Sequence, residues 1–266
     1  MPNSSAPAEF ERSSGAQSGA PASETIALLR GRVSIRKFDD APVPDALVDT
    51  VLEAAFRAPT SSNIQSYSVV VVRDAESRAR LSAVTGNQAH VAATPVFLAF
   101  CADLTRIAHA LEKHGHSIAD NNLEIGLVSS IDATLVGMSA YLAAESVGLK
   151  GVMIGGVRND PQAVAEILGL PHRVYCVFGM CLGWPAGAPP QKPRMAFGAM
   201  VHRERYDGAG MAAALDDYDA ALATHYQAVG KATTADSWTH DVDAKFQPPP
   251  REGLRQALKA RGFDFR

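Results

Sequence analysis

The sequence predicts a single domain that combines helices with strands, and three observations lead to this prediction. Runs of β-branched and apolar residues, typical of buried strands, occur over residues 67–72, 95–101 and 174–182. Apolar residues at three- and four-residue steps, typical of helices, recur in the stretches between these runs. The length of 266 residues, with 47% hydrophobic and 20% charged residues, is enough for one large core.

Composition and charge exclude several classes of partner. The net charge of -3 and the pI near 6.2 offer no basic surface for nucleic acid. No apolar run approaches the roughly 18 residues that span a bilayer. Residues 1–23 are rich in Ser, Ala, Pro and Gly and lack an apolar segment, so we expect a disordered leader, not a secretion signal or a membrane anchor. These features predict a cytoplasmic protein with no nucleic-acid or membrane partner.

Cysteines and histidines raise the question of a metal site. An odd number of cysteines favours buried thiols in a reducing compartment, and their spacing lacks the second ligand pair of a zinc site. They are Cys101, Cys176 and Cys181. A polar stretch carries His109, His114 and His116. A metal site there is the alternative, but no carboxylate or cysteine ligand lies at matching spacing, so we expect an exposed surface segment.

Near the N-terminus, a short helix over residues 25–29 leads into the segment Gly31–Phe38. Arg32, Ser34 and Arg36 lie at alternate positions of this segment. In an extended backbone their donors project to one side, where they could converge on a phosphate. Such a run is also typical of a solvated strand.

The next helix is expected over residues 44–57, because Pro44 and Asp45 suit its start and Pro59 lies just beyond its end. A polar loop follows this packed helix, which is a usual place for ligand contacts. Its candidate donors and acceptors are Thr60, Ser61, Asn63 and Gln65.

After the strand over residues 67–72 we expect a helix over 75–84 and a loop with Gln88 at its end. A long helix should run over 123–147 and end at Gly148. Because that helix is apolar over much of its circumference, it is either central to the core or packed against another subunit.

The segment 151–158 predicts a short strand followed by the double glycine Gly155–Gly156, which lets backbone N–H groups approach a ligand. Asp160 and Pro161 then begin a helix to about residue 168. A dinucleotide-binding turn is the alternative, but the G-x-G-x-x-G pattern and the later acidic residue are absent.

Beyond the last strand, a loop places Lys192 and Arg194 on either side of a proline. This loop either forms an exposed basic turn or holds a fixed positive charge beside an electron-rich ring. Further helices are expected over 211–229, 238–246 and 252–261. So much structure after the last strand suggests an arm that packs on a partner subunit.

Together these segments resemble the nitroreductase family, most of all its larger oxygen-insensitive NADPH nitroreductases and NADPH-flavin oxidoreductases. The resemblance covers residues 25–266. It depends on six motifs in the same order and at similar spacing, which are Arg32–Phe38, Ala58–Gln65, Gly86–Gln88, Gly151–Arg158, Phe178–Pro185 and Lys192–Arg194.

The resemblance implies an α+β fold, the nitroreductase fold, in which helices flank a mixed, largely antiparallel sheet. It implies one FMN-binding domain over residues 24–266 and an intertwined homodimer with two FMN molecules at its interface. The C-terminal extension, about residues 211–266, would pack on the partner subunit.

The resemblance also implies the cofactor-binding residues. The FMN phosphate would be held by Arg32, Ser34, Arg36, Lys192 and Arg194. The flavin or its ribityl chain would face Thr60, Ser61, Asn63 and Gln65, and Gln88 would bond the pyrimidine edge. Backbone N–H groups near flavin N5 would come from Ile154, Gly155 and Gly156. A cation beside the pyrimidine end stabilises the reduced flavin, and an N–H at N5 orients the hydride acceptor.

The sequence departs from the family pattern in two places. Val33 stands where close relatives carry an arginine. The loop over residues 229–235 lacks the arginine pair that binds the 2′-phosphate of NADPH in those relatives, and only Lys231 remains, so either NADPH or NADH could be the electron donor. On the substrate side, Arg251 matches an arginine of the family, and Arg158 adds positive charge nearby.

The implied function is that of an FMN-dependent NAD(P)H oxidoreductase with a ping-pong mechanism and an oxidised acceptor such as a nitroaromatic, quinone, flavin or metal oxyanion. Because the chemistry takes place at flavin N5, we name no catalytic side chain and no metal ligand. Two alternatives stay open. One is a flavin-binding carrier or sensor without turnover, which the altered 229–235 loop suggests. The other is a cofactor-free hydrolase, although the chain has no G-x-S-x-G elbow.

Overall fold

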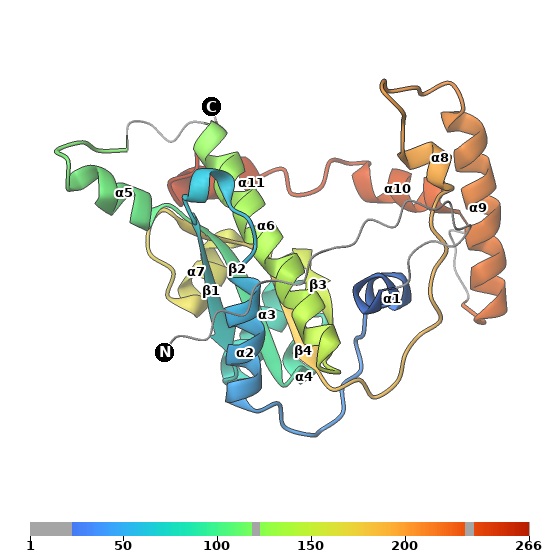
Figure 1. The fold of residues 1–266 in the computed structure, drawn as a ribbon, viewed down its shortest axis with the longest axis horizontal. Coiled ribbons are helices and arrows are strands. Elements are labelled where there is room, and N and C mark those ends of the chain that lie inside the picture. Colours follow the sequence, from blue (N-terminus) through green and yellow to red (C-terminus); the bar gives the residue numbers. More distant parts are fainter. Residues whose placement is uncertain (1–22, 119–122, 232–236, 266) are drawn as a thin grey trace, which may run out of the picture.

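Four strands of the computed structural model form one sheet in the order β1-β2-β4-β3 (Figure 1). They are β1 Tyr67–Val72, β2 Val96–Asp103, β3 Lys150–Ile154 and β4 Val174–Gly183. The structure describes residues 23–118, 123–231 and 237–265. The disordered leader expected over residues 1–23 lies outside this range, apart from Ser23, whose side chain caps the first helix, α1 Glu24–Gly31.

The three strand pairs in the described part of the chain are all antiparallel. In the central pair, Val96 lies opposite Leu182, and at the far edge Ile154 lies opposite Gly179. The family resemblance predicted a mixed sheet, and these strands contain no parallel pair. β2 is buried along its whole length, so both faces of the sheet must be covered.

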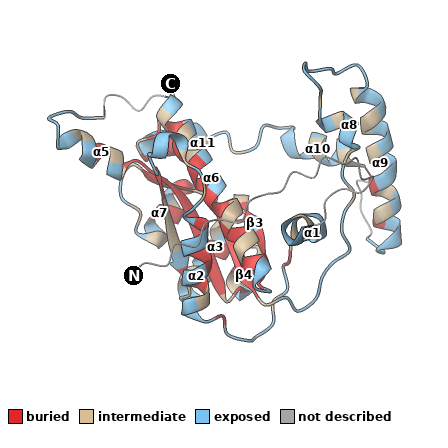
Figure 2. Ribbon diagram, viewed as in Figure 1, coloured by how far each residue is buried: buried red, intermediate tan, exposed pale blue. Residues whose placement is uncertain are grey.

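Helices cover both faces of the sheet (Figure 1). One face packs against α2 Asp45–Ala55 and α6 Leu123–Ser146. The other packs against α3 Ala75–Val84, α4 Ala89–Ala93 and α7 Pro161–Leu168. Buried residues concentrate in the sheet and on the helix faces that meet it (Figure 2). The predicted α+β class is therefore confirmed.

The long helix α6 is central to the core, as one of the two sequence-based interpretations proposed. It packs so closely on the sheet that a Cβ at Gly137 would lie 2.2 Å from the Phe178 ring, which itself stacks on Phe100. By length and composition alone α6 could cross a membrane, so the expectation that no apolar run approaches this size was wrong. In this structure α6 packs inside the domain, where two of its carboxylates, Asp132 and Glu145, are buried.

Local signals placed most helices correctly. Asp160 caps α7 by accepting a hydrogen bond of 2.9 Å from the Ala163 N–H, and Pro161 is the first helical residue, as predicted. Three short helices were not predicted, namely α4, α5 Thr105–Glu112 and α8 Phe197–Met200. The histidine-rich stretch expected as an exposed surface segment begins with a helix, α5, and His109, His114 and His116 are all exposed.

The C-terminal extension divides into two parts. α9 Met211–Ala228 and α10 Trp238–Phe246 pack on each other away from the sheet, with the Tyr218 and Trp238 rings 6.1 Å apart (Figure 1). The chain then returns to its own domain at α11 Leu254–Ala260, and Phe263 is fully buried beside Tyr175. The last part of the extension that we expect over 211–266 thus packs on its own core.

Candidate functional site

One cavity of about 220 Å³ brings together two distant segments of the chain. We call it the cationic cavity, and it is lined by Arg32, Val33, Ser34, Arg36, Pro189, Pro190, Gln191, Lys192 and Arg194. All five residues predicted to hold a phosphate are among them. Four of the lining residues carry a positive charge and none carries a carboxylate, so the cavity suits an anion.

Alternation in the extended segment explains how its donors reach the cavity. The Ile35 side chain is buried, and its backbone N–H donates a hydrogen bond of 3.0 Å to the Gly151 carbonyl at the edge of the sheet. Because neighbouring side chains of an extended strand point to opposite sides, Ser34 and Arg36 point outward. Ser34 also accepts a hydrogen bond of 3.2 Å from Arg32 Nη2.

Two side chains that the sequence interpretation passed over hold this segment in place. Gln191 Nε2 donates hydrogen bonds to the carbonyls of Arg30, at 2.6 Å, and Arg32, at 3.1 Å, which joins the two walls of the cavity. Tyr141 of α6 lies under the Arg32 guanidinium, 5.2 Å from its ring centroid, and donates to the Val33 carbonyl at 3.1 Å. Burial raises the pKa of the Tyr141 hydroxyl, so it remains a donor.

A second tyrosine brings the predicted nucleotide residue Lys231 next to the cavity. Lys192 Nζ donates a hydrogen bond of 3.1 Å to the Tyr226 hydroxyl. Lys231 lies over the ring of the same tyrosine, 4.2 Å from its centroid. Residues 232–236, which include most of the 229–235 loop that lacks the arginine pair, lie outside the described part of the chain.

The predicted polar loop is shaped by left-handed backbone and by one buried carboxylate. It contains the 3₁₀ turn η1 Ser61–Asn63, and Asn63 and Gln65 both have φ near +55°. Asp132 accepts hydrogen bonds from the N–H of Ser61, at 3.0 Å, and from the N–H and hydroxyl of Ser66, at 3.2 and 3.0 Å. Among the described residues of one chain, none of this loop lines the cationic cavity.

The double glycine and Gln88 do lie together. A Cβ at Gly156 would be 2.6 Å from the Thr85 carbonyl and 2.8 Å from Gln88 Nε2, so only glycine fits there without a shift. Gln88 Nε2 donates to the same carbonyl at 2.6 Å. The Ile154 side chain packs in the core, so only its backbone can face a ligand.

The two arginines predicted on the substrate side are neighbours. Arg251 Nε donates to Asn159 Oδ1 at 2.9 Å, and Arg158 Nη1 donates to the Val177 carbonyl at 2.6 Å. The turn η2 Gly155–Arg158 carries Arg158 beside the double glycine. Burial, together with the Arg251 charge, lowers the pKa of Arg158. Arg158 is therefore anchored to the sheet, while Arg251 extends along the glycine turn.

Some of the residues that organise the site left a signal in the sequence. Asp132 is a lone acid within the apolar stretch of α6, where a charge is costly unless it is satisfied. Tyr226 lies on the apolar face of α9. Tyr141 and Gln191 left no such signal, because their roles depend on segments more than 100 residues away.

Comparison with known proteins agrees with this geometry. Residues 29–184 match the Nitroreductase family, and residues 192–266 match the Nitroreductase family, C-terminal domain. The chain is 37% identical over 252 residues to the oxygen-insensitive NADPH nitroreductase of Salmonella typhimurium, covering 92% of this chain and 100% of that protein.

Two solved structures have the same fold. The structure of B. megaterium NfrA2 has a TM-score of 0.88 and 34% sequence identity, and the match covers 92% of this chain and 100% of that chain. The NADPH:FMN oxidoreductase from Vibrio harveyi complexed with NAD+ has a TM-score of 0.81 and 33% identity, with 91% and 99% covered. The chain belongs to the nitroreductase family.

Proposed function

We propose that this protein is an FMN-dependent NAD(P)H oxidoreductase that reduces nitroaromatics, quinones or flavins by a ping-pong mechanism. The observation that carries the proposal is the cationic cavity, in which four positive charges and a serine hydroxyl from two distant segments surround a space without any carboxylate. Such a donor set fits a phosphate dianion. The named activities of the relatives support the same reaction class.

The residues of the cavity fit the FMN phosphate. Arg32, Ser34 and Arg36 would bind it from one wall, and Lys192 and Arg194 from the other. The Arg32 guanidinium already donates to Ser34 and stacks on Tyr141, so little side-chain freedom is lost on binding.

The isoalloxazine ring would lie along the glycine turn. Gly155 and Gly156 carry no side chain, and Gln88 lies beside Gly156, where it would bond the pyrimidine edge. When bound, FMN would supply hydride transfer from NAD(P)H to the acceptor. The chain would then only have to orient both substrates and exclude water, which needs no catalytic acid or base.

The charged residues around the turn suit anionic or electron-rich substrates. Arg158 and Arg251 would provide positive charge on the acceptor side, and Lys231 would lie near the phosphate groups of the nucleotide. With a single lysine in place of an arginine pair, we expect NADPH to be favoured over NADH only weakly.

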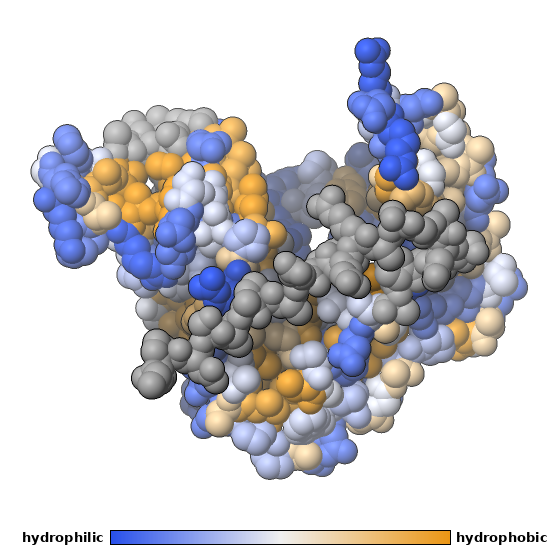
Figure 3. All heavy atoms as spheres, in the orientation of Figure 1, coloured by the Kyte–Doolittle hydropathy of each residue, from blue (hydrophilic) through white to orange (hydrophobic). Residues whose placement is uncertain are grey.

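We also propose a homodimer that completes the site. Thr60, Ser61, Asn63 and Gln65 lie outside the cavity of their own chain, and a second copy would bring this loop to the flavin. An apolar stripe on the outer face of α6 supports this assembly. Its members are Leu123, Leu127, Ile131 and Leu135, all exposed, with Ile131 at 53%. Apolar residues come to the surface along the upper part of α6 in Figure 3.

The chain after β4 would provide the rest of the dimer interface. Phe197 and Tyr206, which are 71% and 75% exposed, lie on the part of the chain that extends away from the sheet. Rings this exposed are unusual on a monomer and typical of a surface that a partner covers. Three free, buried cysteines fit the reducing cytoplasm in which we expect the protein.

Anaerobic stopped-flow spectroscopy tests the proposed function. The purified protein should be yellow, should lose its flavin absorbance when mixed with NADPH or NADH, and should regain it with a nitroaromatic or a quinone. A yellow protein that neither nucleotide reduces would indicate the carrier or sensor instead. A colourless protein that does not take up added FMN would refute both.

A further inference from the structure

Tyr226, in the last turn of α9, contacts two lysines that we assign to ligands. Its hydroxyl accepts a hydrogen bond of 3.1 Å from Nζ of Lys192, which lines the cationic cavity. Nζ of Lys231 lies over the ring, 4.2 Å from its centroid, while Nζ of Lys192 is farther from the ring, at 5.1 Å. The tyrosine is only 4% exposed, but both lysines are exposed. One buried side chain therefore holds one cation with its hydroxyl and another with its ring.

The C-terminal end of α9 brings Lys231 to the ring. Gly230 has φ of +63°, its N–H donates to the Gln227 carbonyl at 3.1 Å, and the Lys231 N–H donates to the Tyr226 carbonyl at 3.0 Å. These two bonds define a Schellman motif, in which the side chain after the glycine packs on the side chain five positions earlier. In this chain those two side chains are Lys231 and Tyr226. The turn that ends the helix thus places a cation over an aromatic face.

A second tyrosine of α9 holds the loop that carries Lys192. The Tyr218 hydroxyl donates a hydrogen bond of 3.2 Å to the Pro193 carbonyl. This bond fixes the backbone next to Lys192, but it goes to a carbonyl and not to the amine. The position of the loop therefore depends on Tyr218, and the position of the Lys192 amine depends on Tyr226.

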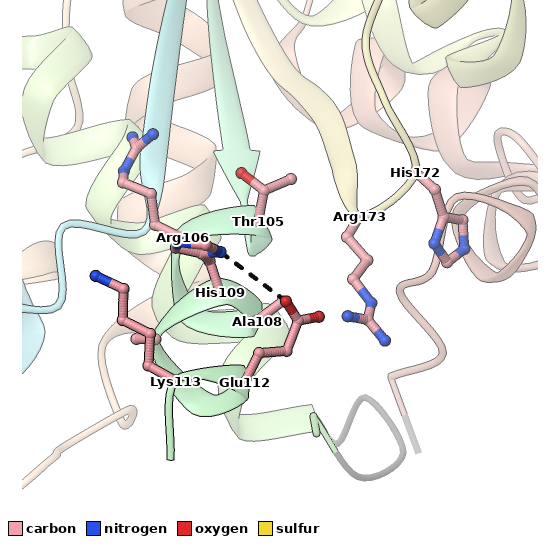
Figure 4. Close-up of a pocket in the computed structure, with 9 residues that line it drawn as sticks. Thr105, Arg106, Ala108, His109, Glu112, Lys113, His172 and Arg173 are labelled. Carbon is pink, nitrogen blue, oxygen red and sulfur yellow. Dashed lines mark ion pairs between the residues drawn. The ribbon is translucent and has the colours of Figure 1, made fainter. Parts of the chain in front are cut away.

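The lysines around Tyr226 have no carboxylate partner among the residues that the structure describes. The cavity of about 770 Å³ beside α5 differs in this respect. There Arg106 pairs with Asp103 at 3.3 Å. The Glu112 carboxylate faces Arg173 across the same cavity (Figure 4). A tyrosine orients an amine without neutralising it as a carboxylate does, so the charges at Tyr226 stay available to an anion.

We propose that Tyr226 is a positioning residue that directs two lysines to two different phosphate ligands. Its hydroxyl holds Lys192 for the phosphate of FMN, and its ring holds Lys231 for the phosphate groups of the nucleotide. A free lysine side chain has to be ordered when it binds a phosphate, which weakens binding, and Tyr226 orders both amines beforehand. The inference rests on the proposed function, because it takes FMN and NADPH as the two ligands.

Fluorescence titration of the apoprotein with FMN tests the role of the hydroxyl. Tyr226→Phe keeps the ring but removes the hydrogen bond to Lys192, so FMN should bind about fivefold more weakly. In a Lys192→Gln background the same change should have no further effect, because the amine that the hydroxyl holds is gone. The matched control is Tyr218→Phe, which removes a bond from α9 to the same loop but none to an amine, and it should change FMN affinity little.

Three results of this titration would overturn the proposal. They are an unchanged FMN affinity in Tyr226→Phe, equal weakening by Tyr226→Phe and Tyr218→Phe, and a full additional loss when Tyr226→Phe is combined with Lys192→Gln. The last two would show that the tyrosine supports the fold of the loop and not the position of the amine.

Nucleotide preference tests the role of the ring. Stopped-flow reduction of the flavin gives the dissociation constants of NADPH and NADH, and their ratio does not depend on how much of a variant is folded. The wild type and Tyr226→Phe should favour NADPH by the same factor, because both keep the ring. Tyr226→Leu removes the ring and Lys231→Gln removes the charge, so each should bring the two constants close together.

The outcomes separate this proposal from the proposed function. If Tyr226→Leu kept the wild-type ratio, the ring would not position Lys231, and the proposal would be overturned. If Lys231→Gln kept it, Lys231 would not belong to the nucleotide site, which would overturn the proposal as well. In both cases the flavin would still be reduced. A flavin that neither nucleotide reduces would refute the proposed function, and the FMN titration would then decide on Tyr226 alone.

Discussion

The backbone N–H of Ser61 donates a hydrogen bond of 3.0 Å to Oδ1 of Asp132, a fully buried carboxylate in the middle of α6. The second oxygen of the same carboxylate accepts from Ser66 at the other end of the loop. One side chain therefore fixes both ends of the loop that we assign to the flavin. No lysine or arginine neutralises this carboxylate among the described residues, so these hydrogen bonds alone compensate its burial.

Replacing this carboxylate should affect both stability and cofactor binding. Asp132→Ala leaves three donors without an acceptor, two of them on buried Ser66, so the free energy of unfolding should fall by about 3 kcal/mol. Asp132→Asn keeps one acceptor oxygen and should lose less. Urea unfolding measures this loss, and Asp49→Asn on the exposed face of α2 is the control. If Asp132→Ala were as stable as Asp49→Asn, the loop would not depend on this carboxylate.

Arg36→Gln tests the cationic cavity directly. Removing one charge-assisted hydrogen bond to the phosphate should weaken FMN binding by about 1.5 to 3 kcal/mol. Fluorescence titration of the apoprotein with FMN gives the affinity. Arg57→Gln removes a charge from an exposed position outside the cavity and should change little. Equal affinity in the wild type and Arg36→Gln would show that the phosphate binds elsewhere.

Gly156→Ala tests the close contact in the glycine turn. The added methyl group would meet the Thr85 carbonyl at 2.6 Å, and a backbone atom cannot move aside as a flexible side chain can. We expect a stability loss of about 1 to 3 kcal/mol and slower flavin reduction. Gly31→Ala, where an added Cβ meets nothing within 4 Å, should be neutral or stabilising. Thermal unfolding and stopped-flow reduction would show whether the two variants differ.

Ile131→Glu tests the proposed dimer. A charge in the centre of the exposed stripe on α6 would be buried without a partner in a dimer, so sedimentation velocity should show a monomer. The monomer should also retain FMN less well, because the loop from the second copy is lost. Arg80→Glu, on the opposite side of the sheet, should remain a dimer. A dimeric Ile131→Glu protein would place the interface on another surface.

Asp103 should make stability depend on acid pH. Burial by itself would raise its pKa, but hydrogen bonds from Ser68 and Thr105 and the Arg106 charge outweigh burial and hold the pKa below its usual value. A carboxyl with a lowered pKa in the folded state stabilises the fold fully above its unfolded pKa of about 4, and the stabilisation is lost as pH falls through the folded value. Unfolding experiments from pH 7 down to about pH 2 should therefore show a smaller fall in stability for Asp103→Asn than for the wild type. Parallel curves would contradict this assignment.

The sequence predicted those parts of the fold whose cause is local. The continuous apolar run of β1 and the Asp160–Pro161 start of α7 carry their own signals, and both elements were found close to their predicted bounds. α5 was not predicted because the stretch was interpreted from its three histidines as polar surface. The apolar side of the helix, Ile107 and Ala108, was overlooked. α4 and α8 have five and four residues, too few for a helical pattern to show.

Local patterns predicted the residue types of the candidate site, and the family resemblance predicted that five of them lie together, but the hydrogen bonds that hold them could not be predicted. Alternation in Gly31–Phe38 indicated which side chains share a side, and the structure agrees. No local pattern could indicate that Gln191 bonds to the carbonyl of Arg30, or that Lys192 and Lys231 meet at Tyr226. Such pairings depend on how the chain folds back on itself, which only tertiary structure reveals.

Asp132 and Tyr141, which hold the polar loop and the cationic cavity respectively, stand nine residues apart on one continuous helix. Nine residues correspond to two and a half turns, or about 13 Å along the axis, and one inserted residue would turn one end by about 100° relative to the other. The distance between the polar loop and the cationic cavity is therefore set by one stretch of helix. Substitutions can change either one alone. A gain or loss of even one residue between Asp132 and Tyr141 would rotate the polar loop relative to the cationic cavity.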